Sequence, residues 1–216
     1  HEGGHGDGRR LRAVDPLHPL TTPPLFPWRL ILASASPRRR QLLQGLDLPV
    51  EITSVDVDET PPAGMPHADV AEHLARKKAA AWIGDLAEDQ VLITADTTVL
   101  IGDVLLNKPA DATEARIMLA LLAGRTHRVI TGVCFRTAHS TKSFADIAEV
   151  TFASLNEAEI AYYVDRYAPL DKAGAYGVQD WIGYVGVERI NGSFYTVMGL
   201  PLHRVYALIK QLQPPR

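Results

Sequence analysis

The sequence predicts an α/β protein with a mixed β-sheet flanked by helices. Apolar stretches typical of strands alternate along the chain with segments that carry helix-start signals. Val91–Ile101 is rich in β-branched residues, as expected for a central strand. Two later stretches, His127–Arg136 and Lys142–Ala153, are expected to pair with each other as strands. This pairing in the middle of the chain is what predicts a mixed sheet.

The first half of the chain is divided by local signals. Ser36 and Pro37 are the residue types preferred at a helix cap and at the first helical position. Apolar and polar residues alternate after residue 50, which predicts a strand, and Pro109 breaks the chain after the central strand. Strands are therefore expected at residues 30–33, 50–57 and 91–101, and helices at 37–46, 69–83 and 112–122.

The second half follows the predicted strand pair. Ser154 and Glu157 have the spacing of a capping box, which predicts a helix over 157–167. Glycines crowd the stretch 174–192, which predicts loops around one short strand at 187–190. A terminal helix is expected at 202–212.

Composition indicates a globular protein. The chain has 216 residues, 46% apolar and 22% charged, with a net charge of −3. Proteins that coat nucleic acid are usually basic, so no nucleic-acid partner is expected. The longest apolar run, 117–123, is too short to span a bilayer, and we expect a cytoplasmic protein without a membrane partner. Cys134 is the single cysteine, which excludes an internal disulfide, and its apolar neighbours predict a buried, inert thiol.

The first 28 residues differ from the rest. They hold four glycines, five prolines and three histidines without a helical or strand period, and they predict a flexible tail. A histidine metal site at His1 and His5 is the less favoured alternative. Residues 29–216 are expected to form one catalytic domain.

The stretch Ala33–Arg40 is unusual for a helix start. Its small residues would let a ligand approach the backbone, and the free N–H groups of a first helical turn suit a phosphate. Cations there oppose the helix dipole by about 0.3–1 kcal/mol each, so Arg38 and Arg39 predict a bound polyanion. Arg40 is expected to be solvated.

Two carboxylates are candidates for a metal site. Asp96 interrupts an otherwise apolar strand, which is costly unless the carboxylate is paired or holds a metal. Glu59 follows the second predicted strand. Mg²⁺ prefers a few carboxylates together with substrate phosphates, and Glu59 with Asp96 would supply them.

Three polar residues are weaker candidates when taken singly. Lys78 lies on an amphipathic helix, and Lys108 follows a strand, where a loop could direct it at phosphate. Gln179 follows a tight glycine turn, and its amide could read a base edge. His127 starts a strand without a partner in the sequence and is interpreted as structural.

Together these stretches resemble the Maf family of nucleoside triphosphate pyrophosphatases. The resemblance covers Leu30 to the C-terminus, and its motifs occur in order at natural separations. They are residues 34–39, Asp58–Glu59, 75–79, 95–97, 107–109, 127–133, 174–179, and 192–195 through 199–201.

The resemblance implies an elongated α/β fold similar to that of inosine triphosphate pyrophosphatases, with two lobes around a nucleotide cleft, and commonly a homodimer. It implies hydrolysis between the α- and β-phosphates with a divalent cation, Mg²⁺ or Mn²⁺. Carried over to this chain, Asp96 is the proton acceptor or a metal ligand, and Glu59 assists metal or water. The phosphate site would be lined by Ser34, Arg39, Lys78 and Lys108.

The resemblance also implies the substrate. The branch acting on dTTP and UTP is marked by Arg38, Thr97 and Gln179, all present here. Modified pyrimidine triphosphates are further expected substrates, as in the cleaning of nucleotide pools. The stretch Asp180–Tyr184 departs from the family pattern. A nucleotide-binding regulator of septum formation without turnover remains the alternative.

Overall fold

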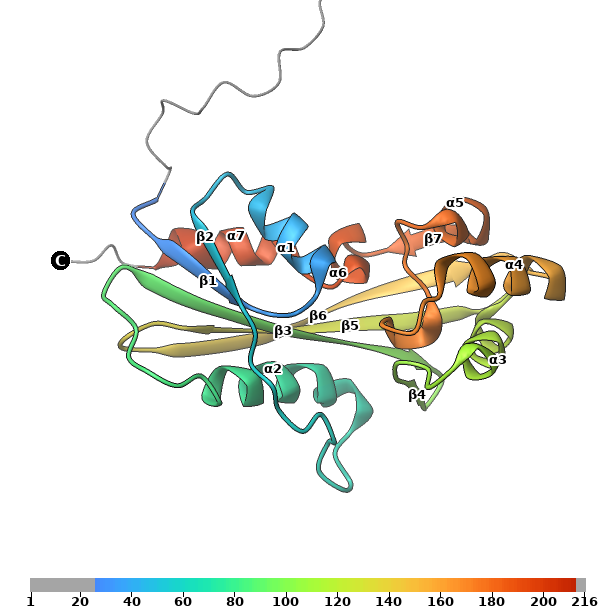
Figure 1. Cartoon of the computed structure of the whole chain (residues 1–216), viewed down its shortest axis with the longest axis horizontal. Helices are drawn as coiled ribbons and strands as arrows, with labels where there is room; N and C mark the ends of the chain where they lie inside the picture. The colour runs from blue at the N-terminus through green and yellow to red at the C-terminus, as the bar shows by residue number, and fades with distance from the viewer. Residues whose placement is uncertain (1–25, 213–216) are drawn as a thin grey trace, which may run out of the picture.

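A computed structural model describes residues 26–212, and within them one mixed sheet contains seven strands (Figure 1). The strands are β1 (Arg29–Ala33), β2 (Val50–Thr53), β3 (Gln90–Ile101), β4 (Val104–Leu106), β5 (Thr126–Arg136), β6 (Thr141–Phe152) and β7 (Val187–Asn191). Their order is β2-β1-β3-β5-β6-β7, and β4 pairs with the end of β3. Strands β2, β1 and β3 are parallel, whereas β3, β5, β6 and β7 are antiparallel neighbours. The predicted mixed α/β sheet is confirmed.

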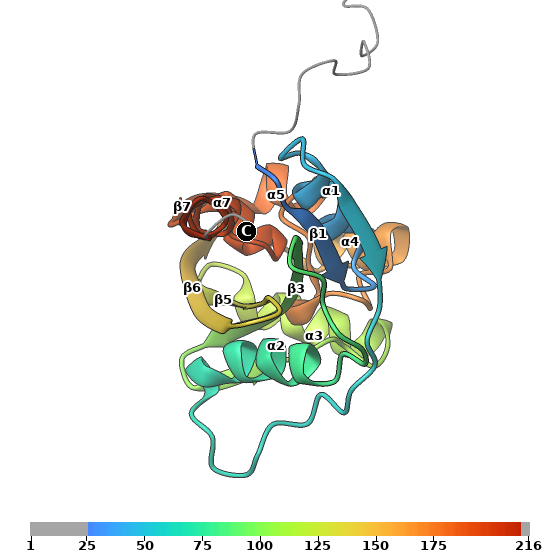
Figure 2. The same ribbon diagram turned by 90° about the vertical axis from the view of Figure 1, so that its left-hand side faces the viewer.

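Helices lie on both faces of this sheet. They are α1 (Pro37–Gln44), α2 (Val70–Ala80), α3 (Ala112–Leu122), α4 (Glu157–Tyr167), α5 (Trp181–Gly186), α6 (Phe194–Met198) and α7 (Leu202–Gln211), with short 3₁₀ turns at His67–Asp69 and Ala173–Ala175. α2 crosses one face of the long strands, while α1, α6 and α7 lie on the opposite face (Figures 1 and 2). The described chain is elongated along β3, β5 and β6, with α3, α4 and α5 gathered at one end (Figure 1).

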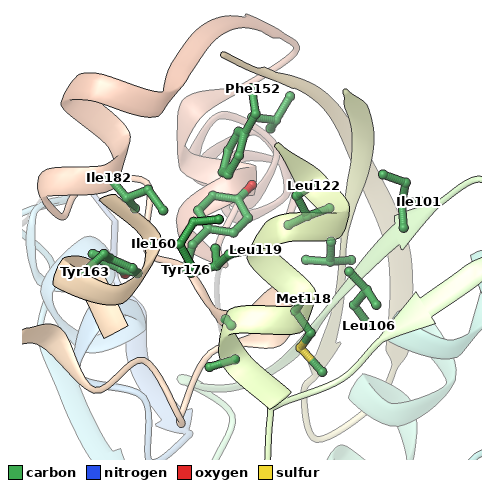
Figure 3. Close-up of a cluster of buried hydrophobic side chains, with 14 of the residues drawn as sticks. Ile101, Leu106, Met118, Leu119, Leu122, Phe152, Ile160, Tyr163, Tyr176 and Ile182 are labelled. Carbon is green, nitrogen blue, oxygen red and sulfur yellow. The ribbon is translucent and has the colours of Figure 1, made fainter. Parts of the chain in front are cut away.

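Two large clusters of buried side chains stabilise the two ends of the sheet. One cluster joins α3, α4 and α5 to β3, β5 and β6 through Leu119, Phe152, Tyr163 and Ile182, each 1% exposed or less (Figure 3). Burial of a large apolar side chain stabilises the fold by about 1.5–3 kcal/mol. The other cluster packs α1 and α7 against β1 and the first half of β3. The long strand β3 runs through both clusters, so it connects the two ends rigidly.

The residues just before β1 pack into the second cluster, although the sequence predicts them as the end of a flexible tail. Trp28 is 5% exposed within it, and Phe26 packs edge-on against Tyr206 of α7. Most of the expected tail, residues 1–25, lies outside the described residues. The histidine site considered at its start lies outside them too.

Several predicted element ends were wrong. β2 ends at Thr53 rather than at residue 57, because the following residues leave the sheet and lead into the cavity described below. α2 ends at Ala80 rather than at residue 83, and Ala81 is exposed. Ile83 is 94% exposed, so burial does not extend the helix that far. α1 also ends two residues early, at Gln44.

The N-cap of α4 lies two residues later in the chain than the sequence predicts. Asn156, not Ser154, caps the helix: its side chain accepts a hydrogen bond from the Glu159 N–H at 2.9 Å, and the Glu159 carboxylate accepts one from the Asn156 N–H at 2.8 Å. Both residue pairs have capping-box spacing, and only the backbone geometry at Asn156 decides between them.

The glycine-rich stretch contains more helix than expected. α5 lies within the predicted loop region, and α6 follows directly after it. α5 is held by tertiary contacts: Ile182 is 1% exposed, and Trp181 packs edge-on against Tyr162 of α4 at 4.9 Å. Helices this short depend on such packing rather than on local propensity.

Two further expectations concern single features. Cys134 is fully buried, and burial raises its pKa to about 11, which agrees with an inert thiol. Across the described residues, the structure contains no helix with the length and apolar character that a bilayer crossing requires.

Candidate active site

A cavity of about 310 Å³ opens between the two buried clusters. It is lined by the end of β1, the start of α1, the middle of β3, and the loops that precede α2, α3 and α5. Every residue that the sequence predicted for the site lines it: Ser34, Arg38, Arg39, Glu59, Lys78, Asp96, Thr97, Lys108 and Gln179. Residues up to 145 positions apart in the chain are therefore brought to one place by the sheet order.

The turn from β1 into α1 forms one wall of the cavity. The Ser34 hydroxyl accepts a hydrogen bond from the Ser36 N–H at 3.2 Å, and the Ser36 hydroxyl accepts one from the Arg39 N–H at 3.4 Å. Ser36 thus caps α1 as its position before Pro37 predicted. The turn sends Arg38 and Arg39 from the first helical turn to the cavity wall.

The two arginines have different surroundings. Arg38 contacts the Asp171 carboxylate at 3.3 Å, and Asp171 also contacts Lys172 at 2.8 Å. Partial burial opposes ionisation of Asp171, but the hydrogen bond and charge of Lys172, with the charge of Arg38, hold its pKa below the usual value. Arg39 instead donates to neutral oxygens of Gly199 and Thr97. Arg39 has no direct carboxylate contact among the described residues, so its charge is left to attract an anion.

Lys78 connects the two carboxylates. Its ammonium lies 2.8 Å from Glu59 Oε1 and 2.7 Å from Asp96 Oδ1, and the residue is only 9% exposed. Lys108 reaches the other oxygen of Glu59 at 3.5 Å. The group therefore alternates cations and carboxylates along the cavity wall. Low exposure strengthens the charge interaction between Lys78 and Asp96, whereas the Glu59 and Lys108 side chains are 45% and 58% exposed and their contact is weaker.

The position of Lys78 follows from how α2 packs on the sheet. Leu74, Ala75 and Lys78 lie on the buried face of α2, three or four residues apart. Gly132 of β5 pairs directly with Asp96 of β3. A Cβ at Gly132 would lie 2.3 Å from the backbone of α2, so only glycine lets the helix approach this closely. The close approach brings the Lys78 ammonium to the Asp96 carboxylate.

The charge balance at Glu59 favours its ionised form. Partial burial opposes ionisation, but the hydrogen bond and charge of Lys78, with the charge of Lys108, outweigh it. The pKa of Glu59 is therefore lower than usual. For Arg39, burial lowers the pKa, and the charge of Asp96 counteracts this. An arginine stays protonated at neutral pH regardless, so Arg39 remains a cation.

The cavity wall also includes Gln179, which lies on an anchored turn. Tyr163 donates a hydrogen bond to the Asp180 carboxylate at 2.7 Å and accepts one from the Gly177 N–H at 3.0 Å. Tyr176, at the start of the turn, shares a 2.7 Å hydrogen bond with His127. Among residues 26–212, the buried Gln179 Oε1 has no hydrogen-bond partner. A buried acceptor without a partner is costly, and a donor on a bound ligand would satisfy it.

Some cavity residues were not singled out from the sequence. Asp171 and Lys172 precede the glycine turn at Gly174 by three and two residues, and that proximity to a motif was a usable signal. Val197, Met198 and Gly199 also line the cavity, and they lie in the C-terminal motif of the family pattern, 192–201. His127 lies in the buried cluster, 2% exposed, rather than on the cavity wall.

Comparison with known proteins places the chain in a family. The family of Maf-like proteins matches residues 29–212. A dTTP/UTP pyrophosphatase of Parabacteroides distasonis is 48% identical over 184 residues, which cover 85% of this chain and 95% of that protein. Proteins with the same name from Porphyromonas gingivalis strain W83 and Bacteroides thetaiotaomicron are 48% and 47% identical over 186 residues each. These alignments cover 85% and 86% of this chain and 94% and 96% of those proteins. With the family match spanning the described fold and cavity, this chain belongs to the Maf-like protein family.

Proposed function

We propose that this chain hydrolyses dTTP and UTP to the nucleoside monophosphate and pyrophosphate. The observation that carries the proposal is one cavity lined by two chemically different sets of residues. Arg39, Lys78 and Lys108 supply cations beside the carboxylates of Glu59 and Asp96, and Gln179 supplies an unpartnered amide oxygen. A polyphosphate suits the first set and a base suits the second. Relatives about 48% identical carry the name dTTP/UTP pyrophosphatase.

The cations bind and stabilise the phosphates. Arg39 offers N–H groups on a planar guanidinium, which matches phosphate oxygens, while Lys78 and Lys108 act as point charges. Ser34 lies beside Arg39, with its Oγ 3.5 Å from Arg39 Nη1. Negative charge develops on the departing pyrophosphate as the bond between the α- and β-phosphates breaks. Fixed positive groups stabilise that charge without reorganising.

Asp96 is the proton acceptor in this proposal. Its carboxylate has low exposure, lines the cavity and accepts a hydrogen bond from Lys78. It would take a proton from the water that attacks the α-phosphorus, with Glu59 and Lys78 holding the carboxylate and the water in place. The bond to the β-phosphate oxygen then breaks, and pyrophosphate leaves with that electron pair.

Glu59 and Asp96 would also hold the divalent cation. No cluster of three or more His, Cys, Asp or Glu residues suited to a metal occurs among residues 26–212. Two carboxylates around one ammonium nevertheless fit Mg²⁺ or Mn²⁺, because such ions are commonly bound by one or two carboxylates and substrate phosphates. When bound, the ion supplies Lewis-acid neutralisation of phosphate charge.

Gln179 would read the base. Its amide has one donor and one acceptor, which complement the carbonyl and ring N–H shared by uracil and thymine. Arg38 and Thr97 line the same cavity and complete the set associated with this substrate class. The same recognition would accept pyrimidine triphosphates modified away from that edge, so we include modified nucleotides in the proposed pool-cleaning role.

The test is product analysis with purified full-length protein. Each common nucleoside triphosphate is incubated with Mg²⁺ or Mn²⁺, and products are separated by chromatography. The proposal expects UMP and dTMP with pyrophosphate, and little product from purine nucleotides. Diphosphate with orthophosphate would place the cut at the wrong bond. Saturable nucleotide binding without turnover would instead favour a regulatory protein.

Two expectations about organisation accompany this proposal. We propose that residues 29–216 act as one catalytic domain, that the tail before it packs onto this domain at its end through Phe26 and Trp28, and that the active form is a homodimer. Light scattering of the full-length protein at assay concentration measures the mass directly. A monomeric mass with full activity would contradict the homodimer.

A further inference from the structure

One edge of the Arg39 guanidinium is already occupied by protein. Arg39 Nε donates to the Gly199 carbonyl at 2.8 Å, and Nη2 donates to the Thr97 hydroxyl at 2.9 Å. Nη1 has only a long contact of 3.5 Å with Ser34. Since each terminal nitrogen carries two N–H groups, these contacts leave one N–H on each of them for a ligand.

The hydrogen-bond directions beyond Thr97 follow from counting protons. Thr131 lies directly opposite Thr97 in the β3–β5 register, and their hydroxyl oxygens are 2.9 Å apart. The Thr131 hydroxyl donates to the Thr196 carbonyl at 2.8 Å, which uses its single proton. The proton between the two threonines must therefore belong to Thr97. The direction runs from Arg39 through Thr97 and Thr131 to the carbonyl of Thr196.

Both contacts of the guanidinium end at the same turn, which closes a ring. The Gly199 N–H also donates to the Thr196 carbonyl, at 3.1 Å. Gly199 has φ 106°, a left-handed conformation that favours glycine. A Cβ there would lie 3.3 Å from Thr97 Oγ1 and 3.5 Å from Arg39 Nε. The C-terminal turn of α6 therefore holds Arg39 directly through Gly199 and indirectly through the two threonines.

We propose that Thr131 and Thr97 are positioning residues that fix Arg39 for phosphate binding. Thr131 is fully buried, so it acts on substrate only through Thr97 and Arg39. The hydroxyl proton of Thr97 is spent on Thr131, so Thr97 contributes by orienting the guanidinium rather than by donating to the nucleotide. This inference rests on the proposed function in one respect, the role of Arg39 at the phosphates.

The test measures pyrophosphate binding by titration calorimetry with Mg²⁺ present, together with kcat and KM for UTP. Thr131→Val keeps the shape of the side chain and removes the hydroxyl, and Thr131→Ser restores the hydroxyl. Thr94→Val is the matched control. Thr94 is equally buried on β3, but its hydroxyl donates to the Ala75 carbonyl, outside the ring.

The dissociation constant for pyrophosphate should rise about tenfold in Thr131→Val, as expected for one lost buried hydrogen bond in a charged network. Thr131→Ser and Thr94→Val should both stay within about threefold of the unaltered protein. Equal losses in Thr131→Val and Thr94→Val, or a serine variant as weak as the valine variant, would overturn the proposal.

A second comparison uses the fact that Thr97 and Thr131 follow one another in the same series of hydrogen bonds. Thr97→Val should weaken pyrophosphate binding as much as Thr131→Val. The double variant should bind pyrophosphate no more weakly than either single variant, because both substitutions break the same hydrogen-bond relay from Arg39 through Thr97 and Thr131 to Thr196. Additive losses of pyrophosphate affinity in the double variant would overturn the proposal. If Thr131→Val does not fold, the comparison of Thr97→Val with the control Thr94→Val still tests it. Unaltered protein that binds pyrophosphate without cleaving UTP would contradict the proposed function, while the binding comparison would still judge the relay.

Discussion

Burial of His127 makes the stability of this protein depend on pH. The imidazole is 2% exposed, shares a 2.7 Å hydrogen bond with Tyr176, and packs edge-on against Phe152 at 5.0 Å. Within the part of the chain that the structure describes, no carboxylate contributes to its environment, and burial lowers the pKa from 6.5 to about 4. The folded protein therefore holds His127 neutral at pH values where the unfolded chain protonates it.

The sign and size of the effect follow from this difference. Between about pH 6.5 and pH 4 the unfolded chain binds more protons, so the free energy of unfolding falls as pH falls. The stability is complete above pH 6.5. The gap between the two pKa values corresponds to about 3 kcal/mol, of which about 2 kcal/mol is lost between pH 7.5 and 5.0. That is a large part of the 5–15 kcal/mol typical of domains.

Urea unfolding followed by circular dichroism at pH 7.5 and pH 5.0 measures this loss. His127→Gln keeps a polar group beside Tyr176 but does not titrate. The unaltered protein should lose about 2 kcal/mol more than His127→Gln over this pH interval. His139→Gln is the control, because the His139 side chain is 74% exposed, and it should lose as much as the unaltered protein. Equal losses in the unaltered protein and His127→Gln would refute the reasoning.

Three further predictions concern the cavity, and a fourth concerns the buried tyrosine that anchors the turn of Gln179. Asp96→Asn should abolish UTP hydrolysis while nucleotide binding, measured by calorimetry, stays within about threefold, because the amide keeps the shape but accepts no proton. Gln179→Glu should lower kcat/KM for UTP and dTTP about tenfold relative to GTP, since a carboxylate cannot donate to the base carbonyl. Lys78→Met should lower kcat about 100-fold, because the carboxylates of Glu59 and Asp96 lose the cation they share. Tyr163→Phe should lower the free energy of unfolding in urea by about 1–3 kcal/mol, because a buried backbone N–H loses its acceptor.

Neighbouring residues provide controls for the last two variants. Lys77→Met removes a lysine of α2 whose ammonium, among residues 26–212, has polar contacts with Asp58 alone, so it should leave kcat within about twofold. Tyr162→Phe alters the exposed neighbour of Tyr163 and should cost less than 0.5 kcal/mol, as is usual at surfaces. An active Asp96→Asn variant would remove that residue from the chemistry. Unchanged relative rates for Gln179→Glu would show that the amide does not read the base.

Much of the fold could be read from local signals. Helix α3 lies at the residues predicted for it, and Ser36 caps α1 where Pro37 marks the first helical position. These features depend on neighbours three or four residues apart, so the chain itself contains the information. The ends of β2 and α2 could not be read this way, because each element ends where distant parts of the chain no longer bury its apolar residues.

The residue types of the site were also readable, since they broke local rules. Arginines at a helix start and a carboxylate in an apolar strand are costly without a compensating contact. The sequence alone could not reveal which contact compensates each one. Lys78 connects Asp96 to Glu59 because Gly132 lets α2 approach the sheet, and that depends on strand order.

The sequence by itself therefore determined the class of the fold, most of its helices and strands, and a set of charged residues suited to a polyphosphate. Only the tertiary structure decided the partners of those residues, the helical state of 181–186, and the ring from Arg39 to Thr196. The physical reason is the distance along the chain between the residues that interact. Caps and periods act within one helical turn, whereas Arg39, Thr97 and Thr131 meet only when three separate elements pack together.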